Sequence, residues 1–270
     1  MSMDTRPHIL IKLEALQRLI MLNTLSGVLP LYIVTEYPKS GGSWLCSMLS
    51  EYMNIPFPRN RRPEITSSIM HGHISYSPFM KNVTCLYRDG RDVMVSLYYH
   101  MLFENDKNSS ALVSRTRSDL DYLDVDDIKT NLSSFIDYIY ANESKSISPF
   151  KFTWGKFVRD WIDKDVNAVK YESLIDDCYG TMKVLLENLT NLPIDEERLK
   201  QIVHKYSFAN QTNRKPGQED IKSFIRKGQP GDWKEKFTKE SAETFNGYYS
   251  SEMKKLGYAE DDSWVETLKV

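Results

Sequence analysis

Residues 31–53 read LYIVTEYPKSGGSWLCSMLSEYM, and the organisation of the whole chain follows from this stretch. Its first part, Leu31 to Val34, is apolar and partly β-branched, which predicts a short buried strand that ends before Pro38. Apolar side chains then recur at helical spacing, at Leu45, Met48, Leu49 and Met53. The stretch therefore predicts a strand, a tight glycine-containing loop and a helix.

The loop between this strand and this helix has the composition of a phosphate site. Its residues are Ser40, Gly41, Gly42, Ser43 and Trp44. The glycines let backbone N–H groups converge on an anion, the start of the helix adds unpaired donors, and Lys39 adds a full positive charge. In the common nucleoside-triphosphate loop, G-x-x-x-x-G-K-S/T, the lysine follows the last glycine, whereas Lys39 precedes both glycines here. The sequence therefore predicts a phosphate loop of a different kind.

A second pattern suited to an anion follows the next apolar run, Val83 to Tyr87. Arg88 comes directly after this predicted strand, at the edge where open parallel sheets bind their ligands. Asp92 is expected to cap the next helix, and Ser96 is one turn further on. A guanidinium and a hydroxyl together suit a phosphate monoester.

A third pattern lies near the C-terminus, where residues 226–237 read RKGQPGDWKEKF. Arg226 and Lys227 place two cations before Gly228, and Gly231 follows three residues later. The glycines let the backbone wrap around an anion, while the two side chains supply charge. This segment therefore also predicts phosphate binding.

In this order, the three patterns resemble the sulfotransferases of the cytosolic and bacterial type that use 3′-phosphoadenosine 5′-phosphosulfate (PAPS). Residues 39–44 resemble the loop that binds the 5′-phosphosulfate. Arg88, Asp92 and Ser96 match the first 3′-phosphate segment, R-x-x-x-D-x-x-x-S, and residues 226–237 match the second without a gap. The resemblance covers about Tyr32 to Phe237.

The resemblance also implies a base and an adenine site. His73 matches the family's general base by its distance to Arg88, and His71 falls where the family usually has a lysine. An alignment in which His71 is the base stays open. Tyr171 resembles the residue beside the adenine, and Phe208 resembles the aromatic residue that stacks on its face.

The resemblance implies a sulfotransferase that moves the sulfuryl group of PAPS, by in-line displacement, to a hydroxyl or amine. The acceptor is a small molecule or a carbohydrate, and the product is adenosine 3′,5′-bisphosphate (PAP). Lys39 and its loop would neutralise the leaving phosphate, and no metal is expected. Two alternatives remain: a nucleotide kinase-like phosphotransferase with an aberrant loop, and a PAP-binding module without catalysis.

The expected fold is α/β, a single domain over residues 1–270 with a central parallel sheet flanked by helices, similar to P-loop nucleotide-binding folds. Residues 1–28 are expected to hold an N-terminal helix, amphipathic over 8–24, that lies on the domain. The polar segment 104–131 is expected to be a lid or acceptor loop.

Two departures from the family pattern concern single positions. Gly42 stands where most members have threonine, so the loop lacks one hydroxyl. Lys239 replaces a valine of the family's dimer pattern, which predicts a monomer or a weak homodimer.

Composition narrows the choice of partners and compartment. A net charge of −2 gives no reason to expect nucleic acid as a partner. The apolar segment from Leu16 to Val34 is interrupted by polar residues and runs into the phosphate loop, so no membrane span is expected. Three scattered cysteines predict neither a disulfide framework nor a zinc site, which favours a reducing, cytoplasmic location.

Overall fold

The computed structural model describes residues 8–59, 64, 67–144 and 152–268. The chain divides into two compact units. The sheet unit comprises Met1–Tyr87 and Lys164–Asn213, and the helical unit comprises Arg88–Asp163 and Arg214–Val270. Each unit is described by itself.

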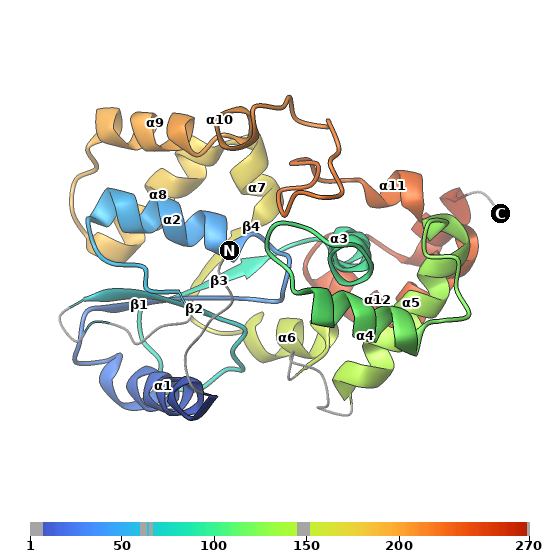
Figure 1. The fold of residues 1–270 in the computed structure, drawn as a ribbon. Coiled ribbons are helices and arrows are strands. Elements are labelled where there is room, and N and C mark those ends of the chain that lie inside the picture. Colours follow the sequence, from blue (N-terminus) through green and yellow to red (C-terminus); the bar gives the residue numbers. More distant parts are fainter. Residues whose placement is uncertain (1–7, 60–63, 65–66, 145–151, 269–270) are drawn as a thin grey trace. The chain divides into compact units, whose positions relative to one another are not determined.

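The sheet unit contains four parallel strands in the order β2-β1-β3-β4 (Figure 1). They are β1 (Leu31–Glu36), β2 (Ser68–Gly72), β3 (Val83–Tyr87) and β4 (Asn167–Lys170). The register pairs Val34 of β1 with His71 of β2 and with Thr84 of β3. This parallel sheet with its helices confirms the expected α/β class.

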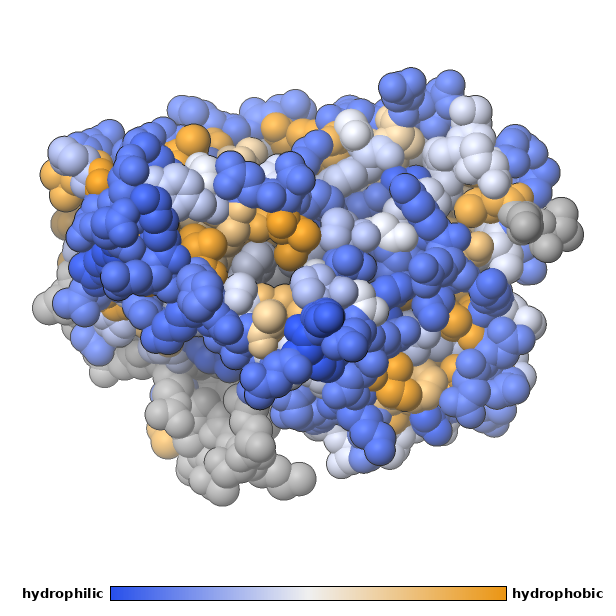
Figure 2. All heavy atoms as spheres, turned by 90° about the horizontal axis from the view of Figure 1, so that it is seen from above, coloured by the Kyte–Doolittle hydropathy of each residue, from blue (hydrophilic) through white to orange (hydrophobic). Residues whose placement is uncertain are grey.

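Helices of the sheet unit cover one face of this sheet (Figure 1). They are α2 (Gly42–Met53), α7 (Tyr171–Asp176), α8 (Cys178–Thr190), α9 (Glu196–Lys205) and α10 (Phe208–Thr212). Val34 and Leu86 of the sheet pack with Leu45 and Leu49 of α2 and Leu186 of α8 in one buried apolar cluster. This core fixes where β1 ends and α2 begins, and so it positions the loop between them. Seen from the α9 side, the surface is mainly hydrophilic with scattered apolar patches (Figure 2).

The N-terminal part forms helix α1 (His8–Ile20), followed by a π-helical turn, η1 (Met21–Leu25). Several apolar side chains of α1 are exposed. Those exposed by 46% or more are Ile9, Leu10, Leu13, Leu16, Leu19 and Ile20. The guanidinium of Arg18 donates to the carbonyl oxygens of His71, at 2.6 Å, and of Arg59. In the part of the chain that the structure describes, no helix is long and apolar enough to cross a bilayer.

The helical unit is built around aromatic side chains. Its elements are α3 (Gly90–Leu102), α4 (Ser110–Asp119), α5 (Ile128–Ser144), α6 (Trp154–Trp161), α11 (Trp233–Lys236), α12 (Lys239–Lys255) and the 3₁₀ turn η2 (Asp262–Thr267). Trp154 of α6 and Phe245 of α12 both pack against Tyr249, with ring centroids 5.5 and 5.0 Å away. Gly90 begins α3 in contact with this cluster, since a Cβ there would lie 2.7 Å from the Phe245 ring.

The segment 104–131, expected to be a loop, is helical over α4 and at the start of α5. The hydroxyl of Ser109 caps α4 by accepting from the backbone N–H of Leu112 at 3.2 Å. Val113, Thr116 and Leu120 are buried, which stabilises the helix despite its polar sequence.

Candidate functional site

The loop that connects β1 to α2 has a strained backbone. Lys39 has φ 72°, which is uncommon for a residue with a side chain, and Gly41 has φ 100°. A Cβ at Gly41 would also lie 2.9 Å from the ring of Tyr171. Glycine at this position is therefore required both by the backbone and by the aromatic ring beside it.

The same loop contains a buried hydroxyl that is not satisfied. Ser40 is 1% exposed, and among the described residues its Oγ has no hydrogen-bond partner. Buried polar atoms are almost always paired, so an unpaired one in a loop predicted to bind an anion fits a ligand oxygen. Trp44 is held by a 2.9 Å bond from its indole N–H to the carbonyl of Tyr206, and its ring lies 6.2 Å from that of Tyr171.

The structure thus places the predicted loop beside Tyr171, the predicted adenine neighbour. Phe208, the second predicted aromatic residue, is the first residue of α10 and is partly buried. Its position follows from Ser207, whose side chain caps α10 by accepting from the N–H of Asn210.

Sequence reasoning missed Glu36, the last residue of β1. Its carboxylate is buried and has two donors: the N–H of Gly42, 2.5 Å from Oε2, and the Nε2 of His71, 2.9 Å from Oε1. Burial alone would raise the pKa of Glu36, but the hydrogen bond and charge of His71 and the Gly42 amide hold it below its usual value. A carboxylate at the end of an apolar strand, just before a phosphate loop, was the signal available in the sequence.

Two different partners orient the two histidines. His73 Nδ1 lies 2.9 Å from the carbonyl oxygen of Glu36. A carbonyl oxygen only accepts, so Nδ1 carries the hydrogen and Nε2 carries the lone pair of the neutral ring. Burial lowers the pKa of His73, although the charge of Glu36 opposes this effect, so the ring is neutral near pH 7. His71 instead donates from Nε2 to a carboxylate, and this difference favours His73 as the base.

In the helical unit, the expected helix cap is wrong. Asp89, not Asp92, caps α3, since its carboxylate accepts from the N–H of Arg91 at 3.0 Å. Asp92 lies in the first turn, 1% exposed, and accepts from the N–H groups of Gly231 at 2.6 Å and Trp233 at 3.0 Å. The physical reason is that a carboxylate pointing away from its own helix can satisfy two amides of a distant turn. Asp92 thereby joins the two predicted 3′-phosphate segments.

The two cations of the second segment are paired with carboxylates. Arg226 contacts Glu219 and Asp232, and Lys227 lies 2.6 Å from Asp232 and 3.0 Å from Glu235. Burial alone would raise the pKa of Asp232, but the two cations hold it below its usual value. An incoming phosphate would therefore share these cations with internal carboxylates.

One donor of this cluster is unused. Arg226 is stacked on Tyr99 of α3, with its guanidinium carbon 4.5 Å from the ring centroid. Within the described ranges, its buried Nε has no hydrogen-bond partner. Gly228 has φ 65°, a left-handed conformation that glycine adopts readily. Arg88 is 9% exposed, and Ser96 is partly buried on α3.

The predicted site residues therefore fall into two groups. The sheet unit contains residues 39–44, His73, Tyr171 and Phe208, and the helical unit contains Arg88, Ser96 and residues 226–228. Among the described residues, no three His, Cys, Asp or Glu side chains are grouped as metal ligands.

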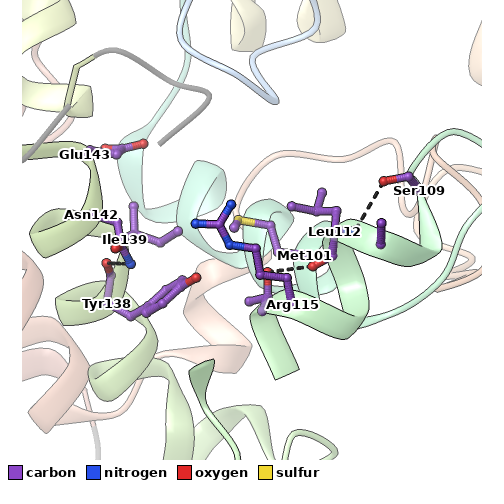
Figure 3. A pocket seen from close by; sticks show the side chains of 10 residues that line it. Met101, Ser109, Leu112, Arg115, Tyr138, Ile139, Asn142 and Glu143 are labelled. Atoms are coloured by element: carbon purple, nitrogen blue, oxygen red, sulfur yellow. Dashed lines mark hydrogen bonds between the residues drawn. The ribbon is translucent and has the colours of Figure 1, made fainter. Parts of the chain in front are cut away.

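The helical unit also contains a cavity of about 270 Å³ between α3, α4 and α5 (Figure 3). Met101 of α3, Leu112 of α4 and Ile139 of α5 give it an apolar lining, and Arg115 and Glu143 add charge. Part of the expected acceptor segment, Ser109 to Thr116, lines this cavity.

Comparison with known proteins finds similar sequences over most of this chain. A family model described as "Sulfotransferase domain" matches residues 60–257. Rat sulfotransferase 2B1 is 26% identical, over 83% of this chain and 70% of the relative. Human sulfotransferase 1E1 is 23% identical, over 82% of this chain and 83% of the relative.

Solved structures show the same fold. Mouse sulfotransferase SULT7A1 complexed with PAP superposes with a TM-score of 0.57 at 16% identity, covering 92% of this chain and 93% of that one. Retinol dehydratase in a complex with retinol and PAP gives 0.58 at 15% identity, covering 87% and 84%.

Proposed function

Because the chain belongs to the sulfotransferase domain family, we propose that it transfers the sulfuryl group of PAPS to a hydroxyl or amine, by in-line displacement, and releases PAP. The acceptor in this proposal is a small molecule or a carbohydrate. The fold is shared with mouse sulfotransferase SULT7A1 and with retinol dehydratase, both solved in complexes that contain PAP, and this agrees with the proposal.

One observation carries the choice of donor. The buried polar atoms without a partner in the described part of the chain include Ser40 Oγ and Arg226 Nε. Ser40 lies in the loop predicted to bind the 5′-phosphosulfate, and Arg226 lies in a segment predicted to bind the 3′-phosphate. Leaving a buried donor unpaired costs about 1–3 kcal/mol, so pairing with a phosphate oxygen is favourable at each of these atoms.

The residues suggest how the reaction proceeds. His73 Nε2 takes the proton of the acceptor as the acceptor atom attacks sulfur. Lys39 and the loop of residues 40–44 stabilise the charge that grows on the leaving 5′-phosphate. Tyr171 and Phe208 hold the adenine, and the 3′-phosphate is bound by Arg88, Ser96, Arg226, Lys227 and Gly228. We propose no metal in this chemistry.

Further proposals concern the whole chain. The family match includes parts of both units, which supports a single sulfotransferase domain over residues 1–270. We propose that residues 104–131 contact the acceptor and that the protein is a monomer or weak homodimer. A cytoplasmic location is supported by Cys46, Cys85 and Cys178, which are all free thiols.

The donor is tested by thermal unfolding with PAP, ADP or ATP, without magnesium. A ligand at 100 times its dissociation constant adds about 2.7 kcal/mol to the free energy of unfolding, so we expect PAP to raise the melting temperature and ADP and ATP to do so far less. Arg226→Ala should abolish the PAP shift, because Arg226 is proposed to bind the 3′-phosphate.

The control for this experiment is Arg198→Ala, since Arg198 is an exposed residue of α9. This variant should keep the full PAP shift. An equal shift with ATP would contradict the donor and favour the kinase-like alternative. A PAP shift without transfer of label from PAPS to any acceptor would favour the non-catalytic alternative.

The pH dependence of kcat/KM tests the base. Because the pKa of His73 is lowered, its neutral form persists below pH 6.5, and we expect the rate to stay on a plateau there and to fall only at more acidic pH. The measurement is the transfer of label from PAPS across the pH range. A rate that already halves above pH 6.5 would contradict a buried, neutral His73.

A further inference from the structure

Glu36 and His71 face the same side of the sheet. Residues two apart on a strand share a face, and Val34 is paired with His71, so all three point toward α2. The exposed fractions of the His71 and Glu36 side chains are 13% and 5%, and the two join at 2.9 Å. Other charged or titratable groups lie near this pair. His73 interacts electrostatically with the Glu36 carboxylate, Arg18 donates to the carbonyl oxygen of His71, and the buried thiol of Cys46 is affected by the charge of Glu36.

The carboxylate fills the space in which a side chain at position 42 would lie. A Cβ on Gly42 would be 2.6 Å from Glu36 Cδ and 2.6 Å from His71 Nε2. Gly42 does not have a positive φ, so its backbone does not require glycine. The absence of a side chain at position 42 is therefore explained by Glu36 and His71.

Stability alone does not explain a carboxylate at this position. Apolar residues of similar volume often replace a buried ion pair without loss of stability. A negative charge beside a phosphate loop also opposes the binding of an anion. A role in the reaction would explain why the chain has Glu36 and His71 here, because the pair fixes an N–H donor beside the loop.

We propose that Glu36 is a positioning residue for sulfuryl transfer. Its two oxygens fix the proton of His71 on Nε2 and the amide of Gly42 at the start of α2, so that His71 supplies an oriented donor where related enzymes have a lysine. The link to the reaction depends on the proposed function, whereas the orientation of His71 does not.

The test is Glu36→Gln, which keeps the shape but offers one acceptor and one donor in place of two acceptors. Because the Gly42 N–H can only donate, the amide oxygen of the glutamine must face it, so His71 must accept at Nε2 and move its proton to Nδ1. Long-range ¹H–¹⁵N spectra of the histidine rings in the full chain, without nucleotide, report the proton position. We expect a proton on Nε2 of His71 in the wild type and loss of this signature in the variant, while His73 keeps its proton on Nδ1.

Kinetics give the second measurement. With labelled PAPS, we expect kcat of Glu36→Gln to fall at least about tenfold, with the donor KM within about threefold, as for loss of an oriented group rather than of ground-state binding. The matched control is Glu51→Gln on the same unit, where a partly exposed carboxylate pairs with Lys205. An unchanged His71 signature, or an unchanged kcat, overturns the proposal.

A second variant keeps both side chains, Glu36 and His71. Gly42→Ala places a methyl group where Glu36 and His71 meet, and it should also remove the His71 signature. In a Glu36→Ala background, Gly42→Ala should lower the free energy of unfolding by less than in the wild type, because the clash with Glu36 is removed and only that with His71 remains. If Gly42→Ala lowers the free energy of unfolding equally in both backgrounds, Glu36 and position 42 are not coupled. A wild type that shows the histidine signature but no PAP shift would contradict the proposed function and leave the orientation of His71 supported.

Discussion

Replacing His73 with alanine should lower kcat for sulfuryl transfer roughly 10²–10⁴-fold, the usual contribution of a general base. The loss is expected to be this large because the hydrogen bond from His73 Nδ1 to the carbonyl oxygen of Glu36 fixes Nε2 as the proton acceptor. The assay is transfer of label from PAPS to a panel of phenols, alcohols, amines and sugars. PAP should still raise the melting temperature, because His73 is assigned to the acceptor proton and not to the nucleotide.

The control for this prediction is His204→Ala, an exposed histidine of α9 in the same unit, which should retain full activity. Added imidazole should partly restore the His73→Ala variant, since a small base can occupy the space of the missing ring. If His73→Ala keeps more than about a tenth of the wild-type rate, another group is the base, and His71 is then the first to test.

Arg91→Ala should lower the free energy of unfolding by about 3–5 kcal/mol, which is typical when one partner of a buried ion pair is removed. The guanidinium donates to Asp89 at 2.7 and 2.9 Å and to the carbonyl of Tyr258 at 2.9 Å. It also contacts two indoles, with its central carbon 3.6 Å from the ring centroid of Trp233 and 4.7 Å from that of Trp264. Urea unfolding followed by circular dichroism measures the loss.

The pH dependence of this loss identifies its cause. Burial raises the pKa of Asp89 to about 6, although Arg91 opposes this effect. A carboxyl with a raised pKa favours the native state most when it is protonated, so this contribution to stability is lost as the pH rises through about 6. Without Arg91 the pKa rises further, and the deficit should be largest above pH 6 and smaller below it.

The control is Arg115→Ala, because Arg115 is 66% exposed and lies 3.9 Å from Asp119, a surface pair that contributes about 0–1 kcal/mol. A deficit in Arg91→Ala that is no larger than in this control would show that the buried pair and the indoles do not stabilise the helical unit.

Much of this protein could be predicted from sequence because the signals are local. The strand, loop and helix around Lys39 follow from apolar spacing and two glycines. Gly41 and Gly228 were expected to lie in turns, and both have a positive φ, which glycine adopts readily. The parallel sheet follows from strands that alternate with helices, and the structure confirms it.

The contacts that only the tertiary structure decided join residues far apart in the chain. Glu36 meets His71 across 35 positions, and Asp92 reaches Gly231 and Trp233 across 139 and 141. Sequence spacing identified Asp92 as important but placed it as a helix cap. The partner of a buried carboxylate depends on strand register and on which amides the fold leaves unpaired. Burying the charge costs little free energy only where hydrogen-bond donors are already present. Local patterns carry no information about that choice.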